Sequence, residues 1–213
     1  MTYSSGGLIQ ATDYNGFVGS SPGSTANQIN TIWAVGNGNA GYGQTALSQV
    51  STGNTVTATQ WATAVNTLNT ILTHQSGSGS GIGAPTAGSI ITYLSTFSSS
   101  LTTAYSNRLN ASTNGTDITG TAPGAATWNT STPTTFQIIR TATFASADQA
   151  RYFFNAGGKL ILTFSATNTL GNSKGADWVT LLNTKFASIT VGATTNVRNG
   201  VGGTATATNA SLG

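Results

Sequence analysis

The chain has 213 residues, of which 5% are charged, and a formal net charge of +3. Ordinary soluble domains carry about 25% charged residues, so charge is not what keeps this protein in solution. Threonine, serine, asparagine and glycine make up about half of the sequence, while 38% of the residues are hydrophobic. This apolar content excludes a wholly disordered chain, and the length is that of one or two domains.

Several classes of chemistry are excluded by residue counts alone. The chain has no cysteine, which rules out disulfides, thiolate catalysis and cysteine-ligated metals. His74 is the single histidine, so one chain cannot form a multi-histidine metal site. We therefore expect no cofactor and no metal. No stretch approaches the ~18 apolar residues of a membrane span, and the N-terminus lacks the basic and apolar segments of a signal peptide, so we expect no membrane association.

Charge divides the chain unevenly. Asp13 is the single charged residue in 1–107, and all the others lie between Arg108 and Arg198. The basic side chains are spread singly rather than in a patch, so we expect no nucleic-acid partner. The composition predicts four parts: an extended N-terminal arm (1–23), a helical assembly domain (24–109), a linker rich in Thr, Asn, Gly and Pro (110–133), and a small α+β domain (134–213).

The N-terminal arm has no apolar period and is interrupted by Gly6 and Gly7. Ser24 is a suitable N-cap for a helix over 25–35, in which Ile29, Ile32 and Trp33 share one face. The turn-forming sequence at 36–44 ends that helix. Its glycine spacing resembles a phosphate-binding loop, but such loops follow a strand rather than a helix, so we expect a tight turn with Tyr42 packed on Trp33.

Two segments carry a heptad pattern of apolar residues, one over 57–73 and one over 89–109. Their remaining positions are Thr, Ser and Asn rather than the charged pairs of a solvated helix. We expect an antiparallel helical hairpin, or one layer of a bundle, that buries its seam against other copies of the protein. The predicted oligomer interface consists of Trp61, Val65, Leu68, Leu72, Ile90, Leu94, Phe97 and Leu101.

Downstream of the linker the apolar period changes to two. Strands are predicted over 134–144, 159–167 and 188–196, with parallel or antiparallel pairing left open. A helix between the first two strands is predicted to start at Ser146, as the first residue of a capping box with Gln149, and to stop at Gly157 and Gly158. A second helix is predicted to open at Ser173. The fold class is therefore α+β, with a C-terminal domain of β-α-β-α-β order.

No catalytic constellation emerges from the remaining polar residues. Asp148 and Asp177 are each expected in the first turn of a helix, where the macrodipole stabilises a carboxylate. His74 is expected to complement the last turn of the 57–73 helix, with a pH-sensitive interface or an intermolecular metal on a symmetry axis as the alternatives. We therefore predict no catalytic residues and no enzyme activity.

Four segments resemble virion structural proteins of tailed bacteriophages, especially those of cyanobacteria. They are QINTIWAVGNGNAGYGQTAL (28–47), VSTGNTVTATQWATAVNTLNTILTHQ (50–75), ADQARYFFNAGGKLILTFSAT (147–167) and DWVTLLNTKFASI (177–189). RYFFNAGGKL (151–160) is the most specific element. The resemblance implies a tail, baseplate or fibre component without enzymatic activity.

The composition of the chain leads to the same expectation. A neutral chain rich in hydroxyl and amide groups forms interface hydrogen bonds without the desolvation cost of buried charges. We expect a homo-oligomer, trimeric or hexameric, that contacts other virion structural proteins and is located in the virion, with the tail favoured. Two alternatives remain: a capsid decoration protein, or a carbohydrate-binding adhesin in which Trp128 and Tyr105 stack on sugar rings.

Overall fold

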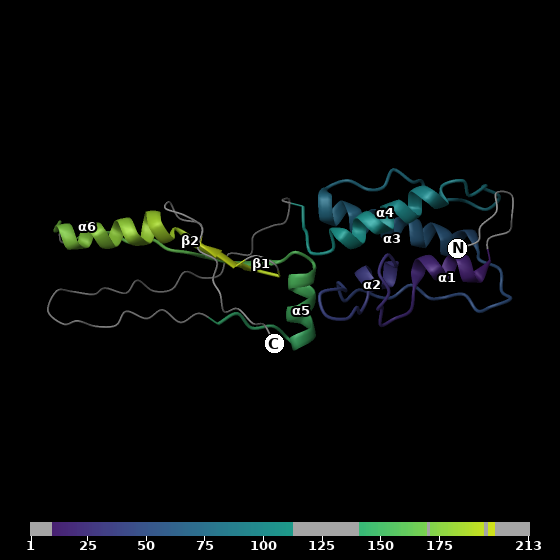
Figure 1. The fold of residues 1–213 in the computed structure, drawn as a ribbon, viewed down its shortest axis with the longest axis horizontal. Helices are drawn as coiled ribbons and strands as arrows, with labels where there is room; N and C mark the ends of the chain where they lie inside the picture. The colour runs from purple at the N-terminus through teal and green to yellow at the C-terminus, as the bar shows by residue number, and fades with distance from the viewer. Residues whose placement is uncertain (1–9, 113–140, 170, 194–195, 199–213) are drawn as a thin grey trace.

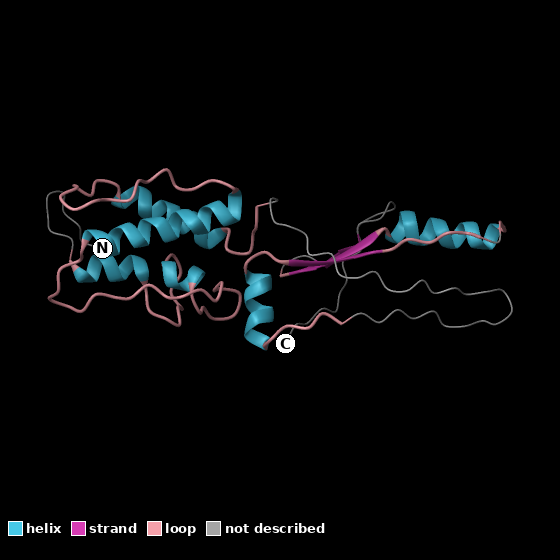
Figure 2. Cartoon of the chain, turned by 180° about the vertical axis from the view of Figure 1, so that it is seen from behind, coloured by secondary structure: helices cyan, strands magenta, loops and turns pink. Residues whose placement is uncertain are grey.

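The computed structural model describes residues 10–112, 141–169, 171–193 and 196–198. The chain is a mixed α+β protein with one antiparallel sheet among these residues. Helices α1 to α4 form a helical unit, and helix α5 lies beside one end of it (Figure 1). The strands lie between α5 and α6, so that α6 is at the far end of the molecule from α1 to α4 (Figure 2).

The core of the helical unit is aromatic at its centre. It is built from α1 (Ala11–Val18), α2 (Ile29–Trp33), α3 (Ala58–Ser76) and α4 (Leu94–Ser106). The indole ring of Trp61 is 2% exposed, and its centroid lies 5.5 to 5.8 Å from those of Tyr14, Phe17 and Phe97. One side chain of α3 therefore holds α1 and α4 together, which makes Trp61 the principal packing residue of this unit.

Helix α1 overturns the prediction of an extended arm over 1–23 for the residues that the structure describes. Ala11, Tyr14, Phe17 and Val18 are buried on one face of this helix. At its start the Asp13 carboxylate accepts a hydrogen bond from Gln10 N (3.1 Å). The helix forms because its apolar face is covered by α3 and α4, and an eight-residue segment gains little helical stability without such packing. The helix predicted over 25–35 is shorter than expected, since α2 covers only Ile29–Trp33 and is preceded by Gln28 rather than Ser24.

The two heptad segments form helices as predicted. Thr57 accepts a hydrogen bond from the Gln60 amide, and the Gln60 side chain accepts one from the Thr57 amide, which fixes the start of α3. Gly77 ends α3 in the left-handed conformation, with φ of 83°. Helix α4 begins at Leu94, five residues later than the start of the segment at 89–109.

The C-terminal elements agree with the predictions in part. Ser146 caps α5 (Ala147–Asn155) by accepting a hydrogen bond from Gln149 N. Strand β1 (Lys159–Thr163) pairs antiparallel with β2 (Ser188–Gly192), which pairs antiparallel with β3 (Asn196–Arg198). The helix after β1 is α6 (Ser173–Thr180), which begins at Ser173 as predicted and is capped by Asn172. It continues as the π-helix η1 (Leu181–Phe186). The strand predicted over 134–144 lies outside the described residues up to Arg140, and 141–144 are in a loop.

Candidate assembly surfaces

The predicted oligomer interface is largely the core of a single chain. Trp61, Val65, Leu68, Leu72, Phe97 and Leu101 are all buried within their own chain, and the most exposed of these side chains is Leu72 at 7%. This corrects the expectation that these six residues face another copy. Helices α3 and α4 pack on each other and on α1 and α2, so the seam is already filled inside one chain.

The other two predicted interface residues are placed differently. Ile90 is 84% exposed, in the loop before α4. Leu94, at the start of α4, is half-buried against the core. Of the eight residues, Ile90 alone presents most of its apolar surface to solvent.

A second surface joins α5 to the loop after α2. The Arg151 guanidinium donates hydrogen bonds to the carbonyl oxygens of Gly36 (2.8 Å) and Ala40 (3.1 Å). The Asn155 side-chain amide, 4% exposed, donates to the carbonyl oxygens of Ala40 (3.0 Å), Gly38 (3.2 Å) and Gly41 (3.3 Å). Two donor side chains, one helical turn apart, thus satisfy a ring of backbone acceptors that the loop aims at α5.

Close backbone approaches complete this junction. A β-carbon on Gly43 would overlap the Tyr152 ring, and one on Gly157 would lie 2.6 Å from the backbone nitrogen of Ala111. Both glycines have positive φ, 71° and 81°. His74 Nε2 lies 2.8 Å from the Ala156 carbonyl oxygen; a carbonyl only accepts hydrogen bonds, so Nε2 carries the proton. His74 lies in the last turn of α3, and this hydrogen bond also joins it to the segment after α5.

Arg151 and Asn155 lie within the segment 151–160, the most specific part of the phage resemblance, but the sequence around them does not indicate their role. A single arginine and a single asparagine on a short helix do not reveal, from the neighbouring sequence, which groups they will contact. Their acceptors are more than a hundred residues away in the chain, with 115 positions separating Arg151 from Gly36. Asp148 forms an ion pair of 3.1 Å with Arg151, but the carboxylate is 69% exposed, so the pair contributes little stability.

We expect Arg151→Met to detach α5 from the loop at 36–41 without unfolding the helical unit. The substitution keeps an apolar stem and removes charge-assisted hydrogen bonds worth about 1.5–3 kcal/mol. Backbone amides of α5 should then exchange hydrogen roughly 10- to 100-fold faster, while those of α3 keep their rate. Lys159→Met, which removes an exposed cation, should leave both rates unchanged. Equal protection of α5 in the two variants would contradict the assignment.

A buried polar cluster lies behind this junction. The Tyr42 hydroxyl donates to the Arg108 carbonyl oxygen (2.9 Å) and accepts from the Gln75 side-chain amide (2.8 Å). Gln75 also donates to the Ala104 carbonyl oxygen. Tyr42 thus ties the loop at 36–44 to α3 and to the end of α4, and its ring packs edge-on against His74. Burial raises the pKa of Tyr42 to about 12, although the Gln75 hydrogen bond and the Arg108 charge act in the opposite direction.

This shift predicts a loss of stability at alkaline pH. The ordinary pKa of tyrosine is 10.0, so the folded state holds the Tyr42 proton more tightly than the unfolded chain does. The stability that the protonated Tyr42 hydroxyl gives the folded state is fully present below pH 10, and it is lost as the pH rises from 10 to about 12. The free energy of unfolding, measured in urea across this pH range, should fall less for Tyr42→Phe than for the parent chain. Identical pH profiles would refute the prediction.

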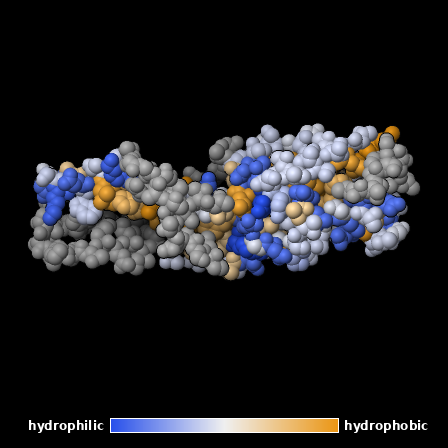
Figure 3. Space-filling model, in the orientation of Figure 1, coloured by the Kyte–Doolittle hydropathy of each residue, from blue (hydrophilic) through white to orange (hydrophobic). Residues whose placement is uncertain are grey.

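The C-terminal elements expose apolar side chains. Ile161 and Leu162 of β1 are 59% and 38% exposed, and Trp178 of α6 is 43% exposed. No residue of α6 or η1 is buried, in the part of the chain that the structure describes. Figure 3 shows apolar surface on this projecting part, whereas much of the helical unit is of intermediate hydropathy. We name Ile161, Leu162 and Trp178 the apolar arm.

The candidate catalytic, metal-binding and sugar-stacking residues do not gather in one place among the described residues. Asp148 lies in the first turn of α5 as predicted, but Asp177 lies in the second turn of α6. No group of three or more potential metal ligands occurs among the described residues. Tyr105 carries the Arg108 guanidinium over its ring, 4.4 Å from the centroid, and Trp128 lies outside the described residues.

In the described part of the chain, no helix combines the length and apolar character needed to cross a membrane.

No family model, curated protein or solved structure matches this chain.

Proposed function

We propose that this chain is a non-enzymatic structural component of a tailed-phage virion, in the tail, baseplate or fibre, that assembles through homo-oligomeric contacts. The observation that carries the proposal is the apolar arm, because a strand and a helix with little burial of their own gain stability when another chain covers them. The resemblance to phage virion proteins at 28–75 and 147–189 is the reason for proposing a location in the virion. The neutral hydroxyl-rich surface suits contacts that must avoid burying charge.

The proposal assigns different roles to the helical unit and to the C-terminal domain. The helical unit acts as a preformed body, and the C-terminal domain, with a proposed β-α-β-α-β order, carries the contacts between copies. The homo-oligomeric interface is thereby assigned to the apolar arm and not to the α3–α4 seam. Trimeric or hexameric symmetry suits a location around the tail axis.

Reconstruction of the whole particle tests the location. We expect density for this chain around the tail axis, in multiples of three or six copies. Hundreds of copies on the icosahedral capsid lattice would replace the proposal with the decoration-protein alternative. Glycan binding by copies at the distal tip would support the adhesin alternative.

Native mass spectrometry of the purified chain tests the interface. We expect a trimer or hexamer, and Ile161→Glu should shift the population toward monomer because it places an unpaired charge in the apolar arm. Asn66→Glu adds the same charge on the exposed face of α3 and should leave the oligomer intact. A monomer for the parent chain at micromolar concentration, or dissociation by both variants alike, would overturn the proposed interface.

A further inference from the structure

Two Asn-Gly dipeptides lie among the described residues, at 15–16 in α1 and at 37–38 in the loop after α2. In this dipeptide the glycine nitrogen can attack the side-chain carbonyl carbon of the asparagine, because glycine has no side chain to crowd the ring that forms and its backbone turns freely. The product is a five-membered cyclic imide, which water opens to aspartate or isoaspartate. In a folded chain this reaction requires that both the asparagine amide and the glycine N–H are free.

The Asn15 side chain is held on both sides. Its amide donates to the Val50 carbonyl oxygen (2.7 Å), and its oxygen accepts from Val50 N (2.8 Å). Gly16 lies inside α1, where the helical hydrogen-bond pattern engages its N–H. Attack by the Gly16 nitrogen on Asn15 therefore requires α1 to open.

The Asn37 side chain is exposed and has no hydrogen-bond partner among the described residues. The backbone N–H of Gly38 likewise donates to no described residue. The Asn37 carbonyl oxygen accepts from Ala40 N (3.2 Å) and closes a turn in which Gly38 has φ of 57°. A β-carbon would meet no atom within 4 Å at Gly38, and the same holds at Gly16, so the two sites differ in hydrogen bonding rather than in crowding.

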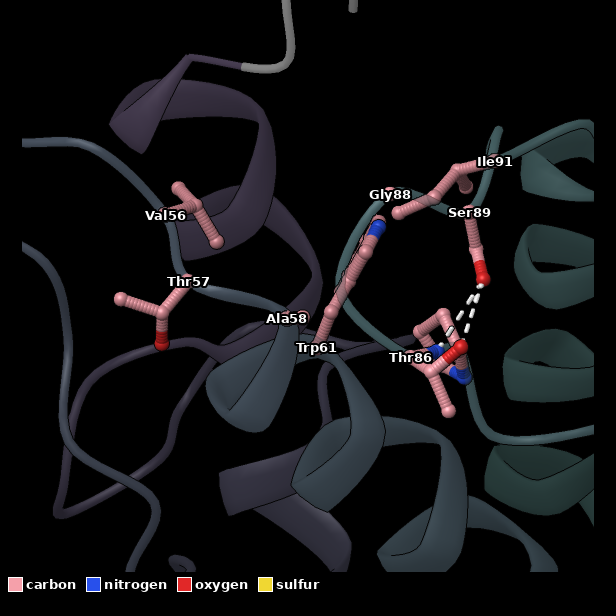
Figure 4. Close-up of a pocket in the computed structure, with 9 residues that line it drawn as sticks. Val56, Thr57, Ala58, Trp61, Thr86, Gly88, Ser89 and Ile91 are labelled. Atoms are coloured by element: carbon pink, nitrogen blue, oxygen red, sulfur yellow. Dashed lines mark hydrogen bonds between the residues drawn. The ribbon is translucent and has the colours of Figure 1, made fainter.

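Neighbouring polar side chains of loops are engaged, in contrast to Asn37. The Asn39 side-chain oxygen, in the same turn, accepts from the Arg108 guanidinium (3.1 Å). In the loop before α4, the Ser89 hydroxyl accepts from Thr86 N (3.2 Å) and lies 3.1 Å from the Thr86 hydroxyl (Figure 4). These side chains hold their loops, whereas the Asn37 amide is left available for reaction.

We propose that Asn37 is a deamidation site and that its conversion loosens α5 from the loop at 36–41. The Gly38 N–H loses its proton to solvent base as the bond from Gly38 N to Asn37 Cγ forms. The side-chain amide nitrogen takes up a proton and leaves as ammonia, and one water molecule then opens the imide. No oxidant, metal or enzyme is needed for these steps.

The isoaspartate product lengthens the main chain by one carbon atom within the turn. Two carbonyl oxygens on either side of this insertion bind α5: Gly36 O accepts from Arg151 (2.8 Å), and Gly38 O accepts from Asn155 (3.2 Å). Their spacing is set by the unmodified backbone, so both contacts cannot keep their present length after conversion. Helix α5 should then separate from the loop more readily.

Ageing of the full chain in warm, mildly alkaline buffer tests the site, because the Gly38 N–H loses its proton more readily as the pH rises. Chymotrypsin cuts after aromatic residues and so releases the peptide 34–42, in which mass spectrometry detects the replacement of NH2 by OH and separates Asn37 from Asn39. A zero-time sample corrects for conversion during digestion. We expect Asn37 to convert at least about tenfold faster than Asn15 in the folded chain, and at a similar rate to Asn15 in guanidinium chloride.

Hydrogen exchange of the aged chain tests the link to α5. Backbone amides of α5 should exchange roughly tenfold faster than in the fresh chain, whereas those of α3 keep their rate. Asn37→Ser, aged in parallel, should keep the fresh rate in α5, because serine suits the first position of the turn and cannot form the imide. This variant undergoes every other change on ageing, including any at the Asn-Gly sequences 114–115 and 199–200, which lie outside the described residues.

Equal rates of conversion at Asn37 and Asn15 in the folded chain would overturn the deamidation site. Conversion of Asn37 with the same α5 exchange as in aged Asn37→Ser would overturn the link to α5. Both measurements use the isolated chain, so their outcome is independent of the proposed location in the virion.

Discussion

Trp61→Ala is expected to destabilise the helical unit by about 3–5 kcal/mol. The indole is the shared contact of α1, α3 and α4, and its removal leaves Tyr14, Phe17 and Phe97 facing a cavity that they cannot fill. Typical domains have an unfolding free energy of about 5–15 kcal/mol, so the loss is a large share of the total. Urea unfolding followed by the circular dichroism of the helices measures it.

Ile90→Ala is the control for this substitution. Ile90 is also a large apolar residue of the same unit, but it is 84% exposed. Its truncation should change the unfolding free energy by no more than about 0.5 kcal/mol. Equal effects of the two substitutions would show that Trp61 is not the centre of the core.

The second large effect is expected at Asn30, which is 1% exposed. Its side-chain amide donates to the carbonyl oxygens of Gly19 and Leu47, and its side-chain oxygen accepts from Leu47 N, all at 2.9 Å. Asn30→Leu leaves three backbone groups without partners, at about 1–3 kcal/mol for each. We expect a loss of at least about 3 kcal/mol in urea unfolding, with α1 and the segment around Leu47 affected together.

Two further variants separate hydrogen bonding from packing at this position. Asn30→Asp keeps an acceptor for Leu47 N but turns an oxygen toward two carbonyl oxygens. The folded state then favours the protonated acid, so its stability should fall as pH rises through the ionisation of that carboxyl. Asn66→Leu, on the exposed face of α3, should stay within about 0.5 kcal/mol of the parent. A pH-independent loss for Asn30→Asp would contradict the geometry.

The sequence pattern predicted those helices and strands that depend on residues close together in the chain. The apolar spacing over 57–73 predicted α3, and Ser146 predicted the start of α5, because helix faces and caps depend on residues three or four positions apart. The alternation at 159–167 predicted β1 for the same kind of reason, although pairing direction did not follow from it. Helix α1 was missed, since its buried face is short and is completed by Trp61 and Phe97 from elsewhere in the chain.

The sequence by itself determined that the seam of α3 and α4 is buried, that the surface is nearly uncharged, and that cysteine chemistry is absent. Only the tertiary structure decided what covers the seam, because an apolar stripe requires burial but does not identify the partner. The same limit applies to Arg151 and Asn155, whose acceptors are carbonyl groups that every residue carries. Their role follows from the path of the loop at 36–41, which brings those carbonyls to α5 across more than a hundred residues of chain.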